Sequence, residues 1–243
     1  MSKRTLVIGD IHGGLKALVE VLENANVTTN DMLIFLGDYV DGWSESAETI
    51  EYLIELSEKQ ECIFILGNHD LWCGLWLEKG VTNPIWLAHG GQETIQSYIK
   101  SGLLTSNKHK QFFKGLKNYF IDKDNRLFIH AGFTSMHGVE KEYNKNDYYW
   151  DRTLWEAARI LKEVNEEKRG EIETRLGLYK EIYIGHTPTT NYGINQPMHA
   201  INLWNLDTGA AFKGKLTILD IHTKEFWQSK RLPLLYPNEK GRN

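Results

Sequence analysis

The sequence contains few residues of the kinds that mark secreted or membrane proteins. Only two of its 243 residues are cysteines, Cys62 and Cys73. Two cysteines cannot form the disulfide framework of a small secreted domain, and reduced structural thiols are typical of cytoplasmic proteins. No run approaches 18 apolar residues, and no apolar signal region precedes the first predicted strand. We therefore expect a cytoplasmic protein with no membrane partner.

An excess of positive charge is also missing. The chain has 28 basic and 32 acidic residues, so its net charge is -4, and this balance gives no electrostatic reason to expect nucleic-acid binding. Its hydrophobic content of 41% is ordinary for a globular protein. At 243 residues, the length fits one large α/β domain spanning residues 1–243. We expect a monomer or a weak oligomer.

Three short apolar runs in the first 70 residues predict buried strands at residues 4–9, 32–37 and 62–67. Helical spacing of apolar residues between them predicts one helix over residues 14–23 and another that Ser46 caps. Alternating strands and helices favour parallel strands with right-handed crossovers. Each strand ends in glycine followed by polar residues: Gly9-Asp10-Ile11-His12-Gly13, Gly37-Asp38-Tyr39-Val40-Asp41 and Gly67-Asn68-His69-Asp70.

The remainder of the chain predicts a helical insertion and then further strands. Helical patterns at 71–77, 92–100 and 107–116 place an insertion around residues 71–117, interrupted by a loop at 79–91. A hairpin pairs 119–121 with 127–129, and a helix spans 150–168. Later strands are predicted at 181–184, 200–206, 215–221 and 224–228, and the prolines from about residue 233 predict a surface tail.

Polar residues at these strand ends predict a metal site. Carboxyl ends of parallel strands meet at one edge of a sheet, where open α/β proteins build their sites. Carboxylate, amide and imidazole ligands suit hard or borderline divalent cations. The candidate ligands number six, which exceeds what one ion needs and matches a two-metal site with a bridging carboxylate: Asp10, His12, Asp38, Asn68, His130 and His186.

The same motifs, in the same order, resemble those of the calcineurin-like metallophosphoesterases. The resemblance covers roughly residues 6–209 and is closest to the phosphoprotein phosphatase branch, which includes bacterial serine/threonine phosphatases and symmetrical diadenosine tetraphosphatases. It implies a four-layer αββα sandwich (α/β, or α+β) of two mixed β-sheets flanked by helices. It also implies two divalent metal ions, with Mn²⁺ first and Fe, Zn, Ni or Mg as alternatives.

The resemblance also implies roles for individual residues. Asp10 and His12 would bind one metal, Asp38 would bridge both, and Asn68, His130 and His186 would complete the second. Asn68 would also reach the substrate phosphate. His69 would be the general acid for the leaving oxygen, and Asp41 would orient its imidazole ring, as carboxylates do at other sites.

One position departs from the family pattern. Gly42 follows Asp41, where the family usually has an arginine that grips the substrate phosphate. Arg152 resembles a second phosphate-binding arginine of bacterial members, and a guanidinium fork matches phosphate oxygens. We expect Arg152 to bind the phosphate, with a surface arginine as the alternative. Trp43 would form a wall or stacking surface for a bulkier substrate.

Other polar and aromatic residues receive less specific predictions. We expect a turn role for Asp207, which precedes Thr208 and Gly209. Core positions are predicted for Trp72, Trp76 and Trp86. A structural or surface role is predicted for the histidines that lack a motif, of which His89 is the best placed to line the crevice: His89, His109, His137, His199 and His222.

Three functions remain open from the sequence. The favoured one is a metal-dependent phosphatase acting on phosphoserine or phosphothreonine, and also on phosphotyrosine, in proteins, by direct attack of a metal-bound hydroxide. The alternative is a symmetrical dinucleoside polyphosphate hydrolase, such as a diadenosine tetraphosphatase. The third is a non-catalytic scaffold, which the complete ligand set argues against. A phosphorylated protein or a small phosphoester is the expected partner.

Overall fold

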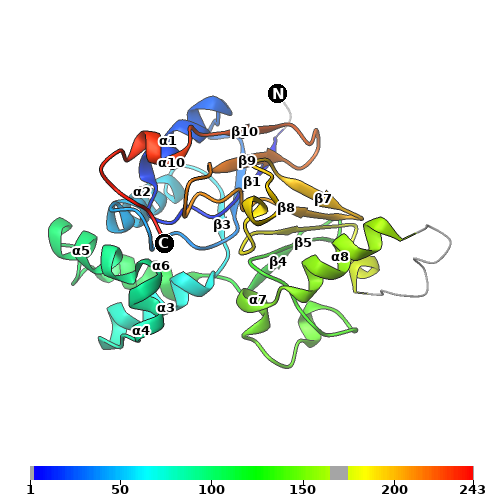
Figure 1. Ribbon diagram of the computed structural model, residues 1–243, viewed down its shortest axis with the longest axis horizontal. Helices are drawn as coiled ribbons and strands as arrows, with labels where there is room; N and C mark the ends of the chain where they lie inside the picture. The colour runs from blue at the N-terminus through cyan, green and yellow to red at the C-terminus, as the bar shows by residue number, and fades with distance from the viewer. Residues whose placement is uncertain (1–2, 165–174, 243) are drawn as a thin grey trace.

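Two five-stranded β-sheets lie face to face, and helices cover their outer surfaces (Figure 1). The computed structural model describes residues 3–164 and 175–242. The strand orders are β10-β9-β1-β2-β3 and β4-β5-β6-β8-β7, and each sheet combines parallel with antiparallel pairs. This arrangement confirms the predicted four-layer sandwich of two mixed sheets.

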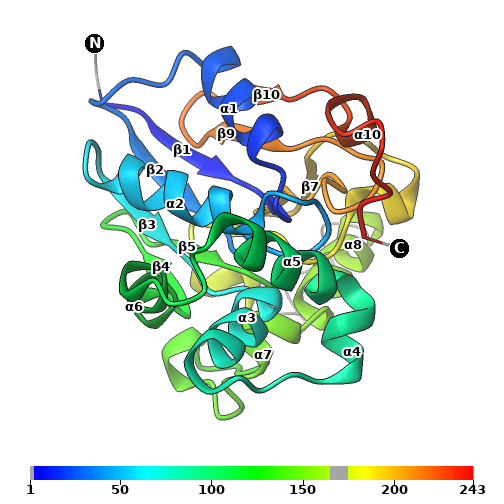
Figure 2. The same cartoon turned by 90° about the vertical axis from the view of Figure 1, so that its left-hand side faces the viewer.

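The first sheet contains the three strands that the sequence predicted near the N-terminus. Its parallel strands alternate with helices, which form on the outer face because their apolar residues repeat at helical spacing. Figure 2 shows both helices in front of these strands. The bounds are β1 (Thr5–Ile8), α1 (Leu15–Asn24), β2 (Met32–Phe35), α2 (Ser46–Ser57), β3 (Cys62–Phe64), β9 (Thr217–Asp220) and β10 (Phe226–Gln228).

The second sheet is built from the later part of the chain, and it begins with the predicted hairpin. Helix α8 packs against β7 and β8 on its outer side. The predicted strand at 200–206 is in fact the second arm of another hairpin, because β7 pairs antiparallel with β8. The bounds are β4 (Tyr119–Ile121), β5 (Arg126–Ile129), α7 (Asp147–Trp150), α8 (Thr153–Glu163), β6 (Glu181–Ile184), β7 (Met198–Ala200) and β8 (Leu203–Asn205).

The strands read as continuous apolar runs because both of their faces are buried. In β1, Leu6 and Ile8 belong to the core beneath the helices, whereas Val7 faces the other sheet. The inter-sheet core includes Phe128 and Tyr183, whose rings stack with centroids 5.0 Å apart. Burial of these side chains holds the layers together and fixes the strand ends relative to one another.

The predicted helical insertion is present but contains more helix than expected. The predicted loop at 79–91 is wrong in its second half, since Pro84 occupies a first helical turn, where its missing N–H costs nothing, and Asn83 caps that turn. Non-helical backbone at His89 and Gly90 then separates two helices. The bounds are α3 (Asn68–Lys79), α4 (Pro84–Trp86), η1 (Leu87–Gly91), α5 (Gln92–Ser101) and α6 (Asn107–Gly115).

The C-terminal segment differs from the predicted surface tail. It forms α10 (Leu232–Leu235), and Tyr236 is only 1% exposed. The ring of Tyr236 stacks on Trp43, with centroids 5.1 Å apart. The prolines predicted a surface tail, but Pro233 lies in the first turn of α10, where proline is tolerated.

Two further boundaries need correction. Ser46 does not cap α2: it is the first helical residue, and its hydroxyl accepts a bond from the backbone N–H of Asp41 instead. The helix predicted over 150–168 begins at Thr153, because Asp151 accepts bonds from the first amides of α8; residues 165–168 lie outside the described residues. Within the described part of the chain, no helix is long and apolar enough to cross a membrane.

Candidate metal centre

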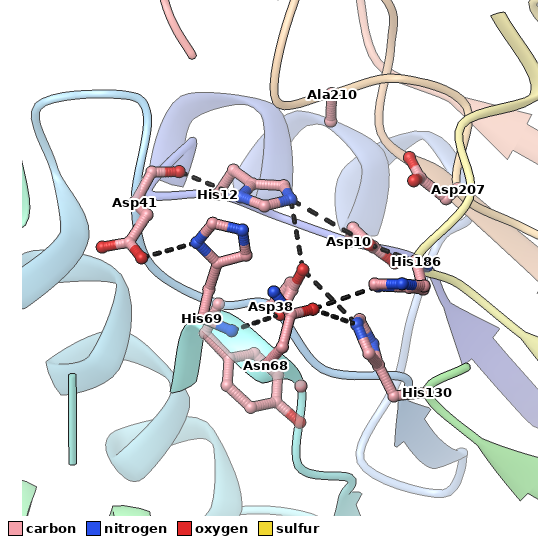
Figure 3. A network of polar contacts seen from close by, with 12 residues as sticks. Asp10, His12, Asp38, Asp41, Asn68, His69, His130, His186, Asp207 and Ala210 are labelled. Atoms are coloured by element: carbon pink, nitrogen blue, oxygen red, sulfur yellow. Dashed lines mark hydrogen bonds and ion pairs between the residues drawn. The ribbon is translucent and has the colours of Figure 1, made fainter. Parts of the chain in front are cut away.

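Five strand ends bring the predicted ligands together between the two sheets (Figure 3). Asp10 and His12 follow β1, Asp38 follows β2, Asn68 follows β3, His130 follows β5 and His186 follows β6. All six side chains are at most 7% exposed. The separations are those of donors around common centres: His12 Nε2 to Asp38 Oδ2 3.6 Å, His130 Nε2 to Asp38 Oδ2 3.4 Å, His12 Nε2 to Asp10 Oδ2 3.9 Å and His186 Nδ1 to Asn68 Oδ1 3.0 Å.

The side chains fall into two groups that share one carboxylate. His12, Asp38 and His69 form one group, and Asp38, His130 and His186 form the other, with the donor atoms of each within 4.8 Å of one another. Asp38 is therefore placed as a bridging ligand requires. The first group contains His69, which was predicted to be the general acid, and does not contain Asp10, so the individual ligand roles stay predictions.

Unusual backbone conformations aim these side chains at the centre. His12, Asp38 and His186 all have positive φ, at 55°, 54° and 66°. Such values are uncommon outside glycine and are found at sites where function requires them. Gly37, at φ 103°, has no alternative, because a Cβ there would lie 2.7 Å from the backbone nitrogen of Gly67.

Hydrogen bonds behind the centre fix two of the imidazole rings. His12 Nδ1 donates to the backbone oxygen of Asp41 at 2.9 Å, and His130 Nδ1 donates to that of Leu36 at 2.8 Å. Because a carbonyl only accepts, each ring carries a proton on Nδ1 and turns Nε2 inward. Asp70 fixes the loop that follows β2, because its carboxylate accepts hydrogen bonds from the amides of Asp38 and Tyr39.

Buried side-chain atoms of two candidate metal ligands have no hydrogen-bond partner within the described residues, and this supports a bound cation. Asp10 Oδ1 and His186 Nε2 are buried and make no hydrogen bond there. Buried polar atoms normally find a partner, so such atoms, next to four further metal-type ligands, indicate a missing group. Carboxylate, amide and imidazole donors fit Mn²⁺, Fe²⁺ or Zn²⁺.

The protonation of the histidines also agrees with a metal site. Burial lowers the pKa of His12 to about 3, so this imidazole is neutral, as a ligand must be. Burial opposes protonation of His130 as well, but the nearby carboxylates of Asp38 and Asp10 outweigh it and raise its pKa to about 10. A bound cation would replace that proton and balance the same carboxylates.

His69 and Asp41 form the predicted pair beside the ligands. His69 Nδ1 lies 2.6 Å from Asp41 Oδ2, and His69 Nε2 is buried without a partner among the described residues. Burial is the main cause that raises the pKa of Asp41 to about 8 and lowers that of His69 to about 3. The imidazole is therefore held by one nitrogen and presents the other to the centre.

Two residues that orient Asp41 were missed from the sequence. Thr94 Oγ1 donates to Asp41 Oδ1 at 2.6 Å, and Trp86 Nε1 donates to Asp41 Oδ2 at 2.8 Å. Trp86 is buried, as predicted, but it also has this polar contact. Both residues come from the helical insertion, 53 and 45 positions along the chain, and no motif marks them.

Asp207 was also underrated. Its carboxylate accepts a bond from the amide of Gly209, which is the predicted turn role. It is, however, 3% exposed, and after burial its charge is the next cause that raises the pKa of Asp10. Figure 3 shows Asp207 beside Asp10. The turn residue therefore contributes to the electrostatics of the centre.

The prediction for Trp43 requires correction, and another tryptophan lies beside the centre. Trp43 is fully buried, stacks on Tyr236 and donates its Nε1–H to the backbone oxygen of Ala210, so it has no face left for a substrate. Trp150 is instead 41% exposed, with its ring 5.8 Å from that of His186 and 5.2 Å from that of Trp72. Trp72 in turn meets His69 edge to face, at 5.3 Å.

Arg152 is exposed and lies directly before α8. The pKa of His186 is lowered first by burial, and the positive charge of Arg152 contributes to the same shift. The guanidinium is thus within electrostatic reach of the centre, and its role as a phosphate ligand stays a prediction. His89 is half-buried and acts in the same way on the pKa of His69.

Taken with the two mixed sheets, two ligand groups that share a carboxylate define a metal-dependent hydrolase of phosphoric esters. The chain belongs to the calcineurin-like phosphoesterase family, whose model matches residues 3–210. Members of this family use a dinuclear metal centre. The family explains why six ligands converge here and confirms the resemblance found in the motifs.

Individual relatives add information on substrates. The chain is 26% identical over 232 residues to an asymmetrical bis(5'-nucleosyl)-tetraphosphatase, PrpE, of Anoxybacillus flavithermus, with 88% of each chain covered. It is 27% identical to a symmetrical bis(5'-nucleosyl)-tetraphosphatase of Xylella fastidiosa, covering 90% of this chain and 88% of the other. A solved structure of a candidate diadenosine tetraphosphatase superposes with a TM-score of 0.62 at 16% identity, covering 94% and 93% of the two chains.

Proposed function

We propose that the protein hydrolyses dinucleoside polyphosphates such as diadenosine tetraphosphate. Dinucleoside polyphosphate hydrolysis was the alternative hypothesis from the sequence, and it now replaces phosphoprotein hydrolysis as the leading hypothesis. The preference for phosphoproteins rested on the family resemblance alone. Two tetraphosphatases that match this chain over nearly their whole length support the alternative.

The observation that carries the substrate class is the exposed aromatic surface beside the metal centre. Trp150 is 41% exposed, and its ring lies perpendicular to that of His186, a candidate ligand, with centroids 5.8 Å apart. Large aromatic side chains are normally buried, and an exposed one next to a polar site is a platform on which a base stacks. A nucleotide has such a base, whereas a phosphoserine side chain does not.

In this proposal the ligand roles follow the geometry. Asp10, His12 and Asp38 hold one divalent cation, and Asp38, Asn68, His130 and His186 hold the other, with Mn²⁺ first among the candidates. Two bound cations lower the pKa of water and neutralise charge on the phosphoryl group. Asn68 and Arg152 orient the phosphate oxygens.

His69 is the proposed general acid. Its Nε2 is directed at the centre, and Asp41 fixes the ring through Nδ1 at 2.6 Å. Trp86 and Thr94 fix Asp41 in turn. Such a chain of contacts holds a proton donor in a defined place, which its contribution to rate requires. It also argues against a non-catalytic scaffold, which has no use for an oriented imidazole.

The test is a substrate panel with Mn²⁺: diadenosine tetraphosphate, a phosphoserine peptide, a phosphotyrosine peptide and p-nitrophenyl phosphate. We expect the highest kcat/KM on diadenosine tetraphosphate, by about tenfold or more. Chromatography of the products then distinguishes cleavage into two ADP from cleavage into AMP and ATP. A higher kcat/KM on either phosphopeptide would return the protein to the phosphoprotein reading.

The remaining expectations also stand as proposals. We infer one domain over the whole chain, a monomer or weak oligomer, and a cytoplasmic location. The last rests on Cys62 and Cys73, which are both free thiols.

A further inference from the structure

A pocket of about 620 Å³ is lined by basic residues of the C-terminal part of the chain. Its volume is in the range of small-molecule sites. The other lining residues are uncharged, and no carboxylate is among them. The cations are Lys213, Lys215, Arg231, Lys240 and Arg242.

These five charges have no counter-ions within the described residues. Some basic residues elsewhere in the chain are paired, as Arg4 is with Asp31 and Lys230 with Glu20, but none of the five forms an ion pair with a described residue. The chain as a whole has a net charge of -4. A concentration of unpaired positive charge on an acidic protein attracts an anion, and several phosphates in a row offer the matching charge.

Arg242 connects this pocket to the metal centre. Burial is the main cause of the low pKa of His12 and of His69, and the charge of Arg242 contributes to both shifts. It also counteracts the raised pKa of Asp41 and of Asp207. The Nε of Arg242 is buried and has no hydrogen-bond partner among the described residues. The guanidinium therefore lines the pocket with a free donor, lies over the Phe212 ring with its Cζ 5.5 Å from the ring centroid, and is within electrostatic reach of the centre.

Gly42 lies against the backbone and Cβ of this arginine. A Cβ at position 42 would lie 3.5 Å from both the Cβ and the backbone nitrogen of Arg242. Gly42 also has φ +121°, which side chains rarely adopt. A long side chain at position 42 would compete with Arg242 for the same space, so the glycine that departs from the family pattern and the terminal arginine belong to one arrangement.

The C-terminal segment is held in place on both sides of this contact. Glu239 accepts bonds from the amide and the hydroxyl of Ser44, at 3.0 and 2.7 Å. The backbone N–H of Arg242 donates to the oxygen of Ala211 at 2.8 Å. In Figure 1 the red segment runs from α10 toward the middle of the molecule. Arg242 is thus positioned by the fold at its backbone.

We propose that the C-terminal segment and the loop between β8 and β9 together form a polyphosphate subsite, in which Arg242 binds a phosphate next to the metal centre and the lysines bind the phosphates beyond it. The identity of the substrate rests on the proposed function, but the subsite itself requires only an anionic chain. All five cations follow residue 210, where the match to the family model ends.

The first experiment tests the pocket without assuming a substrate. Tripolyphosphate is used as an inhibitor of p-nitrophenyl phosphate hydrolysis, with Mn²⁺ in excess over the inhibitor. In Lys213→Glu/Lys240→Glu, we expect the inhibition constant to rise about tenfold or more, because two attractive charges become repulsive. The control is Lys108→Glu, an exposed residue of α6 outside the pocket. An inhibition constant that rises equally in variant and control would overturn the subsite.

The second experiment uses the proposed substrate. In the same double variant, KM for diadenosine tetraphosphate should rise about ten times more than KM for p-nitrophenyl phosphate. The change in kcat for diadenosine tetraphosphate should be smaller than the change in its KM. If the wild type prefers phosphopeptides, the proposed function fails while the tripolyphosphate result still decides the subsite. If the wild type prefers diadenosine tetraphosphate but the variant loses activity equally on both substrates, the function stands and the subsite is wrong.

Discussion

The metal centre and the basic pocket are neighbours that are built in opposite ways. The ligands of the centre are at most 7% exposed, and hydrogen bonds to the backbone fix rings such as those of His12 and His130. The pocket is lined by long side chains on loops and on the C-terminal segment, and Lys213 and Lys240 are exposed. One region is rigid and acidic, and the other is adaptable and basic.

This difference separates the chemistry from the choice of substrate. The buried ligands can hold two cations in one geometry because strand ends and strained backbone leave them little freedom. Exposed lysines cannot position a reacting atom to that precision, but they attract an anionic chain from solution. We therefore expect changes in the centre to lower kcat and changes in the pocket to raise KM, and the predictions below test that division.

The largest effect is expected for Asp38→Asn. Its carboxylate belongs to both ligand groups, so its loss removes a negative charge from both cations at once. Metal content should fall below two ions per chain. The value of kcat should fall more than about 10²-fold, since bound metals lower the activation barrier by several kcal/mol. Elemental analysis at saturating Mn²⁺ measures the first quantity. If the wild type binds only one ion or none, the hypothesis of a dinuclear centre is wrong.

His69→Asn should lower kcat by roughly 10²–10⁴-fold when the leaving oxygen is strongly basic, because it then needs a proton in the transition state. Phenyl phosphate provides such a leaving group, and p-nitrophenyl phosphate does not. The loss should be clearly smaller on the second substrate, and also on diadenosine tetraphosphate, whose leaving group is a phosphate.

Metal content measured on the same preparation completes that test. Both ions should remain, since His69 is not among the six predicted ligands. Loss of one ion would make His69 a ligand, as its place in the first group allows. Equal losses on the two aryl phosphates would contradict the acid role.

The two arginines near the centre should be distinguishable. Arg242→Ala should raise KM for diadenosine tetraphosphate about 10- to 100-fold, which corresponds to ~1.4–2.7 kcal/mol, with metal content unchanged. Arg152→Ala should have an effect in the same range on p-nitrophenyl phosphate too, if Arg152 grips the phosphate under attack. Unaltered kinetics in either variant would show that its arginine is only a surface residue.

A smaller effect is expected from the residue behind the acid. Thr94→Val keeps the shape of the side chain but removes the bond to Asp41 Oδ1, the bond that Thr94 Oγ1 accepts from the backbone N–H of Asp41, and its contact with Ser46 Oγ. We expect kcat on phenyl phosphate to fall about three- to tenfold through misorientation of the His69 ring, because these contacts fix Asp41. Thr105→Val, on an exposed loop, is the control. A loss that is equal on p-nitrophenyl phosphate would indicate a general loss of structure instead.

The same contrast explains what the sequence could predict. The ligands follow apolar strands directly, so Asp10, Asp38 and His130 can be recognised from the local sequence pattern. Parallel strands within one sheet bring Asp10, Asp38 and Asn68 to one edge, but His130 and His186 follow β5 and β6 of the second sheet, so the full set also depends on how the two sheets pack. The four-layer fold, in contrast, came from the family resemblance, because apolar runs buried on both faces do not say how many sheets they form.

The parts that sequence reasoning missed are contacts between distant segments. Trp86 reaches Asp41 across 45 positions, and Trp43 reaches Tyr236 only once the chain has returned from the second sheet. Lys213 and Arg242 are not neighbours in sequence, so their shared pocket leaves no local charge run. The prolines near residue 233 led to the prediction of a surface tail. The local sequence does not show the surface on which α10 packs.

The smallest effect is expected at the base of the C-terminal segment. The hydroxyl of Tyr236 accepts a bond from the amide of Lys16 and donates to Glu45, while its ring stacks on Trp43. Tyr236→Phe keeps the stacked ring and loses both bonds, which should cost about 1 kcal/mol and lower Tm by about 2–4 °C. Tyr143→Phe, at a position that is 98% exposed, is the control.

Because the segment carries Arg242, KM for diadenosine tetraphosphate should also rise about two- to threefold in Tyr236→Phe, while kcat on p-nitrophenyl phosphate stays within experimental error. A lower Tm without any change in KM would mean that the position of Arg242 does not depend on this anchor, and that the pocket is held by Glu239 and Ala211 alone.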